Sequence, residues 1–238
     1  MVLGLYYMTN IKYSTDEVKV KGEGMAFYSL EEVVIAYNEG KVDLHAPIRC
    51  KVKVIENGEL VPTLLETSVG RVLANQYMPE EVGFINQLFY KKALKDIISN
   101  IIEITSVKRT AKFLDAIKDL GFTMAFKGGL SFNLEDVLTP EIKTKQVISA
   151  KEQVAQINDL HNEGHITERE RYNQVVDTWE KMDRNITNDL MTRLKKDKLG
   201  FNSIYMMLDS GARGSRAQIK QLGGVRGLMN KPKKSGAG

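Results

Sequence analysis

The first 75 residues carry apolar runs and apolar–polar alternation punctuated by glycine, a pattern typical of strands. The clearest such segments are VLGLYYM, VKVKGEGMAFY and HAPIRCKVKVIENGELV, the last with a hairpin-like Asn57-Gly58 turn. A short helix is predicted over 29–38, where a serine cap and early glutamates precede a glycine stop. The segment TSVGRVLANQYMP ends this part at Pro79, so we expect residues 1–79 to be β-rich.

Residues 80–139 are predicted to be helical in short pieces, because their apolar positions recur at spacings of three and four. The first piece is KKALKDIISNIIEI. The second, SVKRTAKFLDAIKDLGF, is expected to stop at Gly121. Both apolar faces are typical of a packed core rather than of a site.

Residues 140–198 predict a long antiparallel helical hairpin. Its first helix opens at Pro140 and ends at Gly164, and Thr167 with Glu170 forms a capping-box pair that starts the second helix. At 1.5 Å per residue the second arm spans roughly 40 Å. Its apolar stripe, sustained over four heptads, consists of Tyr172, Val175, Val176, Trp179, Met182, Ile186, Leu190 and Leu194.

The predicted hairpin tip, residues 159–171, is mainly acidic. Two interpretations remain open for it: a structural bundle arm, or a projecting post on which a partner protein docks. No sequence feature separates these two by itself.

Residues 199–238 predict a loop leading into a short helix. Ser215 and Gln218 form a second capping box, and the helix ends at Gly223-Gly224. The preceding loop sets Arg213 between two glycines at a helix N-terminus, where free backbone N–H groups favour an anion. A guanidinium there can give a phosphate a forked contact that a lysine cannot.

Composition narrows the class of protein. Of 238 residues, 42% are hydrophobic and 27% charged, which is typical of a globular chain, and we expect an α+β fold. The single cysteine, Cys50, excludes a disulfide framework and a multi-cysteine zinc site. The opening segment has no basic region and no apolar run of membrane-spanning length, so we expect a cytoplasmic protein with no membrane partner.

Charge is unevenly distributed. The net charge is +4, yet seven Lys and Arg and no acidic residue lie between Arg213 and Lys234. This basic end favours a polyanionic partner. The alternative is a solvated tail, above all for the last eight residues, KPKKSGAG.

The residues read alone give neither an active site nor a metal site. The three histidines, His45, His161 and His165, are scattered, and the two at the hairpin tip lack a third ligand of matching type, so we expect them to be solvated. No Ser–His–Asp or Cys–His arrangement is indicated.

Eight segments, in order, resemble the family of beta-prime subunits of bacterial DNA-directed RNA polymerase. They are VLGLYYMT, KGEGM, LHAPIRCKV, SVGRVL, INQLFYKKALKDII, ERERYNQVVDTWEKM, FNSIYMMLDSGARGS and QIKQLGGVRGLMNKP. The resemblance covers essentially the whole chain and is most specific over 201–232. It implies an internal piece of that subunit, located after the catalytic Asn-Ala-Asp-Phe-Asp-Gly-Asp motif and before the bridge helix and trigger loop. We therefore expect no catalytic residue and no metal in this chain, with Mg²⁺ held by residues outside it.

The resemblance also implies a place in the enzyme: the funnel and wall of the secondary channel, through which nucleoside triphosphates enter. It implies that Arg213 contacts the triphosphate and that the F-loop covers 218–231. The other residues expected to line the active centre are Met206, Met207, Asp209, Ser210, Gly211, Gln218, Lys220, Gln221 and Arg226.

The hairpin then corresponds to the rim helices, on which Gre-type transcript-cleavage factors dock. The docking residues expected at its tip are Asn162, Glu163, His165, Glu168, Arg169 and Glu170. Further implied partners are the beta, alpha and omega subunits and the rest of beta-prime, with DNA and RNA contacted only in the assembled, nucleoid-associated enzyme.

Departures from the family pattern occur at two places. The link KKDKLG after the second rim helix is short, and Asp119 stands where some members use a tyrosine, beside Lys108 and Asp115, to bind a guanosine tetraphosphate alarmone. That stacking group is missing, so we expect no alarmone site. The competing interpretation is a stand-alone module whose hairpin binds protein and whose basic end binds nucleic acid, and a reading frame running only from Met1 to Gly238 would favour it.

Overall fold

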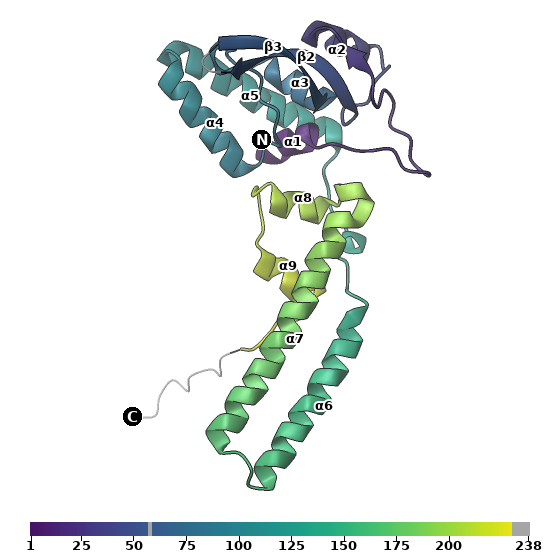
Figure 1. Cartoon of the computed structure of the whole chain (residues 1–238), viewed down its shortest axis with the longest axis vertical. Helices are drawn as coiled ribbons and strands as arrows, with labels where there is room; N and C mark the ends of the chain where they lie inside the picture. The colour runs from purple at the N-terminus through teal and green to yellow at the C-terminus, as the bar shows by residue number, and fades with distance from the viewer. Residues whose placement is uncertain (57–58, 230–238) are drawn as a thin grey trace. The chain divides into compact units, whose positions relative to one another are not determined.

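A computed structural model describes residues 1–56 and 59–229 of the chain. These residues form two compact units: residues 1–132 with 198–213, and residues 133–197 with the chain from 214 on. Helices dominate both, and one small sheet lies in the first unit (Figure 1). The α+β class is confirmed, whereas the division into four parts at 79, 139 and 198 stays a prediction.

The first element is a helix, α1 (Val2–Thr9), so the strand predicted for VLGLYYM is wrong. Leu5 and Met8 are fully buried, and α1 packs on α5 (Val107–Gly128). A Cβ added at Gly4 would lie 2.0 Å from the carbonyl oxygen of Gly121, so the two helix backbones touch. A short apolar run fits a buried helix as well as a buried strand, and this close approach is what the sequence pattern does not contain.

The sheet has three strands in the order β1 (Ala26–Phe27), β2 (Pro47–Glu56) and β3 (Glu59–Ser68). Strands β2 and β3 pair antiparallel from Pro47 opposite Ser68, which confirms the predicted hairpin. Its Asn57-Gly58 turn lies outside the described residues. The buried face of β2 presents Ile48, Cys50 and Val52 to the core, at the spacing of two that a strand requires.

The rest of the predicted β-rich part differs from expectation. In VKVKGEGMAFY only the two residues of β1 pair, because Gly22 and Gly24 adopt positive φ and turn the chain. The predicted helix is confirmed as α2 (Leu30–Asn38), capped by Ser29. The segment after β3 is a helix, α3 (Val69–Asn75), rather than a strand, and begins at the side-chain cap of Ser68.

The helical middle is confirmed as α4 (Lys91–Ile104) and α5, preceded by the 3-10 turn η1 (Glu80–Val82). The predicted stop at Gly121 is wrong, since α5 continues to Gly128 and ends at Gly129, whose φ is +54°. Gly121 serves as a contact point for α1 instead of a cap. The core of the first unit includes Phe89, Ile101 and Ile117.

The first unit also contains the end of η3 (Asp197–Gly200) and the helix α8 (Ser203–Asp209), which packs on α1. Phe201 lies edge-on to His45, with ring centroids 4.6 Å apart, and His45 in turn lies edge-on to Tyr7 at the same distance. This aromatic cluster attaches the start of α8 to α1 and to the loop before β2.

The second unit is built on the predicted hairpin, formed by α6 (Ile142–Asn162) and α7 (Glu168–Lys196), which run antiparallel in Figure 1. The capping box of Thr167 and Glu170 is present. At 1.5 Å per residue, the 29 residues of α7 span about 44 Å. The 3-10 turn η2 (Leu134–Asp136) and the helix α9 (Arg216–Gly223) complete this unit.

Burial of the α7 stripe is graded along its length. Ile186, Leu190 and Leu194 are at most 1% exposed, whereas Tyr172 near the tip is 63% exposed. The buried half is covered by α9: a Cβ on Gly223 would lie 3.3 Å from Leu190. Only the part of the stripe near α9 therefore belongs to a packed core.

Candidate functional site

The predicted active-centre residues fall into two groups. Met206, Met207, Asp209, Ser210, Gly211 and Arg213 belong to the first unit, whereas Gln218, Lys220, Gln221 and Arg226 belong to the second. The hairpin tip forms a third candidate surface, also in the second unit.

Helix α8 is fixed at its start by Asn202, a fully buried side chain. Its Oδ1 accepts hydrogen bonds of 3.0 Å from the backbone N–H groups of Ile204 and Tyr205. Met206 is 3% exposed and part of the packing, so it lines the core of the unit rather than its surface. The cap and this buried methionine set the direction in which α8 delivers the following loop.

Asp209 ends α8 and accepts a hydrogen bond from a distant residue. The hydroxyl of Tyr6, on α1, donates to Asp209 Oδ2 at 2.7 Å, and the hydroxyl of Tyr205 lies 3.4 Å from Oδ1. Burial, together with the carboxylate of Asp209, raises the pKa of Tyr6 far above its ordinary value. Tyr6 therefore stays protonated and remains a donor.

The loop after α8 is held by backbone and hydroxyl contacts. Ser210 is fully buried, and its carbonyl oxygen accepts from the backbone N–H of Lys91 at 2.8 Å. Its hydroxyl donates to the carbonyl of Met207 at 3.2 Å. Gly211 has φ +70° and a Cβ there would lie 3.2 Å from Lys91, so the position favours glycine.

Arg213 is exposed at the end of this loop. Its backbone N–H donates to the carbonyl of Met207 at 3.3 Å, which closes the loop onto α8. Its guanidinium has no ion pair with any residue that the structure describes. The loop therefore presents the guanidinium to solvent from an anchored backbone, and its contact with an anion stays a prediction.

Helix α9 carries the residues of the second group. Its predicted capping box is confirmed: Ser215 Oγ accepts from the N–H of Gln218 at 3.3 Å, and Gln218 Oε1 accepts from the N–H of Ser215 at 2.9 Å. The side chain of Gln218 is therefore engaged in capping its own helix. Gln221 and Arg226 are exposed.

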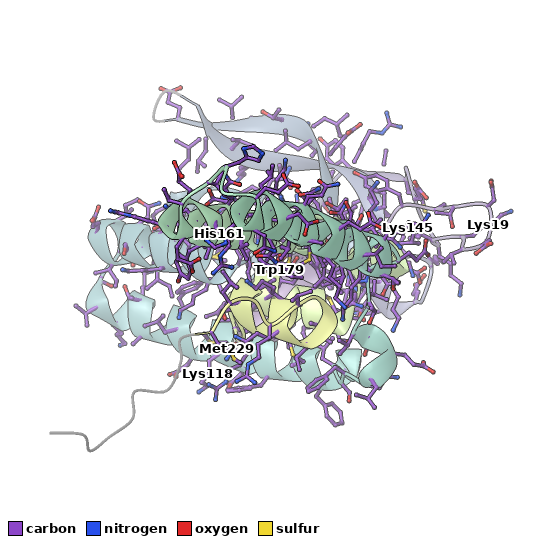
Figure 2. The ribbon with its side chains drawn as sticks, turned by 90° about the horizontal axis from the view of Figure 1, so that it is seen from below. Lys19, Lys118, Lys145, His161, Trp179 and Met229 are labelled. Atoms are coloured by element: carbon purple, nitrogen blue, oxygen red, sulfur yellow. The ribbon has the colours of Figure 1, made fainter. Side chains whose placement is uncertain are left out.

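A groove of about 510 Å³ lies beside α9. Lys220 pairs there with Asp183 of α7, at 2.5 Å between Nζ and Oδ2. The other carboxylate oxygen, Oδ1, is buried and has no hydrogen-bond partner among the described residues. The indole of Trp179 and the segment after α9, including Val225 and Leu228, line the groove; Trp179 and Met229 are labelled in Figure 2.

At the hairpin tip all six predicted docking residues are exposed. Side chains radiate from the hairpin in Figure 2, where His161 is labelled. The tip is not simply acidic, since Glu168 pairs with Arg171 at 2.8 Å and lies 3.3 Å from His161. The bond with Arg171 lowers the pKa of Glu168, so this carboxylate stays charged.

The remaining tip acids also have local partners. Glu170 accepts from the backbone N–H and the hydroxyl of Thr167, both at 2.8 Å, and these bonds lower its pKa. Glu163 lies 3.4 Å from the ring of His165. Asn162 ends α6, and Arg169 has no ion pair with a described residue. Glu163 and Arg169 are therefore the charges least committed to internal structure.

The positions compared with an alarmone site lie on α5 and are exposed. Lys118 lies 3.4 Å from both Asp115 and Asp119. The acid at 119 therefore belongs to a surface ion-pair group. The expectation that no alarmone binds here stays a prediction.

Across 1–56 and 59–229, no group of three or more His, Cys, Asp and Glu side chains is placed to hold a metal ion. Within the same residues, no helix has the length and apolar character needed to cross a membrane.

Sequence reasoning missed four residues that build these surfaces: Tyr6, Lys91, Asp183 and Asn202. Asn202 carried a readable signal, because an asparagine before an apolar run is a helix cap. The other three act through contacts between distant parts of the chain. Asp183 and Lys220 are 37 positions apart, Tyr6 and Asp209 are 203 apart, and Lys91 contacts Ser210. No local pattern marks such partners.

Comparison with known proteins gives a consistent result. The family model described as RNA polymerase Rpb1, domain 3, matches residues 1–137, and that of domain 4 matches residues 166–237. The chain is 55% identical over its full length to the DNA-directed RNA polymerase subunit beta' of Parabacteroides distasonis and 54% identical to that of Bacteroides fragilis. It is 52% identical to the Flavobacterium johnsoniae subunit. The chain spans about 16% of the length of the first two relatives and 17% of the third.

Proposed function

The chain belongs to the RNA polymerase Rpb1 family, and from this membership we propose its function. It is part of the beta-prime subunit of a bacterial DNA-directed RNA polymerase, a nucleotidyltransferase that performs DNA-templated RNA synthesis. Its partners are the rest of beta-prime and the beta, alpha and omega subunits, at the nucleoid in the cytoplasm. The identity of 52–55% along the whole chain is the observation that carries this proposal.

Within that enzyme we assign the first unit's loop 209–213 to the wall of the secondary channel, facing the incoming nucleoside triphosphate. The support is the exposed guanidinium of Arg213, on a loop held by Ser210 and Met207 and without an internal ion pair in the described residues. A forked guanidinium donor on an anchored backbone can stabilise phosphate charge with two parallel hydrogen bonds. Arg213 therefore binds and orients the triphosphate during phosphoryl transfer.

The Mg²⁺ implied by this reaction does not fit the described residues, because they contain no cluster of three metal-binding side chains. In this proposal the residues that hold it belong to the rest of the subunit, and this chain alone does not catalyse nucleotide transfer.

The test of the nucleotide contact uses the assembled polymerase with Arg213→Ala. We expect the apparent KM for nucleotides to rise about tenfold, the effect of losing one charged hydrogen-bonding contact. Arg213→Lys keeps the charge but not the fork, so it should restore only part of the affinity. Promoter binding serves as the control and should not change. Unchanged elongation rates at low nucleotide concentration would contradict the assignment.

We also propose that the hairpin tip docks Gre-type transcript-cleavage factors. The support is the exposure of all six tip residues and the half-exposed apolar stripe near them. Glu163 and Arg169 are the charges available to a partner, since Glu168 and Glu170 already bind Arg171 and Thr167.

Charge reversal separates docking from hairpin stability. Glu163→Lys in the assembled enzyme should weaken factor binding about tenfold, because it replaces a negative charge in the interface with a positive one. The matched control is Glu152→Lys, an identical change at an exposed position of α6 about 15 Å from its end. Equal binding by both variants would remove the tip from the interface.

A further inference from the structure

We propose that Tyr6 is a positioning residue for nucleotide binding: its hydroxyl holds Asp209 and, through Asp209, sets the place of Arg213. This inference rests on the function proposed for Arg213. It adds a residue that is 203 positions away from Asp209 in the chain and that does not itself reach the surface.

The contact is built from a buried donor and an exposed acceptor. Tyr6 is 2% exposed, and its hydroxyl donates to Asp209 Oδ2 at 2.7 Å. Asp209 is the last residue of α8, four positions before Arg213, and the structure exposes it to solvent. The donor is therefore part of the core, while the acceptor is part of the loop base.

Tyr6 is itself fixed by the packing of α1. The backbone of Gly4 touches that of Gly121 on α5, and Leu5 and Met8 on either side of Tyr6 are fully buried. A side chain anchored in this way has little freedom to follow movements of the loop. The hydrogen bond from this hydroxyl therefore restrains the end of α8.

Two backbone bonds also hold the loop that carries Arg213. The carbonyl of Ser210 accepts from the N–H of Lys91, and the carbonyl of Met207 accepts from the N–H of Arg213. Of the two hydroxyls that bond to Asp209, that of Tyr6 lies at 2.7 Å and that of Tyr205 at 3.4 Å, and Tyr6→Phe removes the shorter bond.

Removing the hydroxyl affects position more than stability. In Tyr6→Phe the ring still fills its site, and the exposed Asp209 carboxylate regains hydrogen bonds from water. The end of α8 then loses its hydrogen bond to α1, and the Arg213 guanidinium samples positions away from the triphosphate. A misplacement of about 1 Å at such a contact is enough to weaken binding.

The experiment measures nucleotide addition by the assembled polymerase carrying Tyr6→Phe. We expect the apparent KM for nucleotides to rise three- to tenfold, for all four nucleotides alike, with a smaller change in kcat. The matched control is Tyr7→Phe, which removes the neighbouring hydroxyl, one without a hydrogen-bond partner in the described part of the chain. That variant should match the unmodified enzyme.

Epistasis distinguishes positioning through Arg213 from a general structural role. In an Arg213→Ala background, Tyr6→Phe should cause no further rise in KM, and Asp209→Ala should likewise add nothing. Both substitutions should raise KM when Arg213 is present. A further rise in the Arg213→Ala background would overturn the inference, because Tyr6 would then act elsewhere.

The outcomes also separate this inference from the function on which it rests. A raised KM in Arg213→Ala with an unchanged KM in Tyr6→Phe would overturn the role of Tyr6 and leave the nucleotide contact standing. No change in either variant would overturn both. Should Tyr6→Phe fail to assemble, Asp209→Ala in the presence and absence of Arg213 decides the question by the same criteria.

Discussion

Lys220 of α9 and Asp183 of α7 form an ion pair whose side chains are only 24% and 18% exposed. Helix α9 has eight residues, too few to be stable in isolation. Its position therefore comes from tertiary contacts: the buried Ile219, the close approach of Gly223 to Leu190, and this pair. The segment after α9 also packs against this ion pair, since a Cβ on Gly227 would lie 3.4 Å from Lys220 Nζ.

Breaking this pair should destabilise the second unit. Asp183→Ala leaves the Lys220 ammonium half-buried without its partner, which we expect to lower the free energy of unfolding by about 1–2 kcal/mol. Urea denaturation monitored by the fluorescence of Trp179, the single tryptophan, reports on this region. Lys118→Met removes an exposed pair on α5 and should leave the transition unchanged. Equal effects of both variants would show that burial of the Asp183 pair is immaterial.

The contact between α1 and α5 should tolerate no side chain. In Gly4→Ala the added Cβ would lie 2.0 Å from the Gly121 carbonyl oxygen, so the helices must separate, at a cost of about 2–3 kcal/mol. Thermal unfolding measures this loss. Gly129→Ala is the graded control, because its φ of +54° is strained for alanine but no atom lies within 4 Å, and it should cost about 1 kcal/mol. A Gly4→Ala protein as stable as Gly129→Ala would contradict the close packing.

His45 should make the first unit sensitive to mild acid. Burial lowers its pKa from 6.5 to about 4, against the opposing hydrogen bond to the carbonyl of Asn10. Because the unfolded chain binds the proton first, stability is fully present above pH 6.5 and falls as the pH drops towards 4. The shift is worth on the order of 3 kcal/mol.

The measurement is the free energy of unfolding between pH 7 and 4, for the unmodified chain and for His45→Asn. The variant should be less stable at pH 7 but show a shallower loss in acid. His165→Asn, at the exposed hairpin tip, should keep the slope of the unmodified chain. Parallel curves for the unmodified chain and His45→Asn would exclude His45 as the source.

The capping box at the hairpin tip should control fraying of α7. Thr167→Ala removes the oxygen that accepts from the Glu170 N–H, which typically costs about 1 kcal/mol. Amide hydrogen exchange should therefore accelerate about fivefold in the first turn of α7 while the amides near Leu190 keep their protection. Thr178→Ala, in the middle of α7, is the control, since its hydroxyl only donates to the carbonyl of Gln174. Uniform acceleration along the helix would contradict local fraying.

Local signals in the sequence predicted the features that depend on local bonds. The caps at Ser29, Thr167 and Ser215 and the hairpin of β2 and β3 are confirmed because turn and cap chemistry spans only a few residues. Residue chemistry indicated an anion contact at Arg213, and the resemblance identified that anion as a nucleoside triphosphate.

The failures share a physical cause. In VLGLYYM and SVGRVL, which lie in helices, the glycines touch other backbones: Gly4 meets α5, and a Cβ on Gly70 would lie 1.7 Å from the carbonyl oxygen of Met8. Gly121 looks like a helix stop for the same reason, although it is a contact surface. Glycine marks either chain reversal or close approach, and the sequence does not distinguish the two. The bond from Tyr6 to Asp209 was likewise beyond local reasoning.

The graded burial along α7 gives the hairpin uneven stiffness. Near Leu190 the side chains of α7 are buried in a packed core, so thermal motion there requires displacing their neighbours. Among the described residues, the helix around Tyr172 is supported by α6 alone, and each turn bends or opens at far lower energy. The hairpin is therefore rigid near Leu190 and compliant near Tyr172. A protein that binds the tip can change the conformation of the tip at low energy cost. The displacement it causes there is not transmitted to the packed part around Leu190.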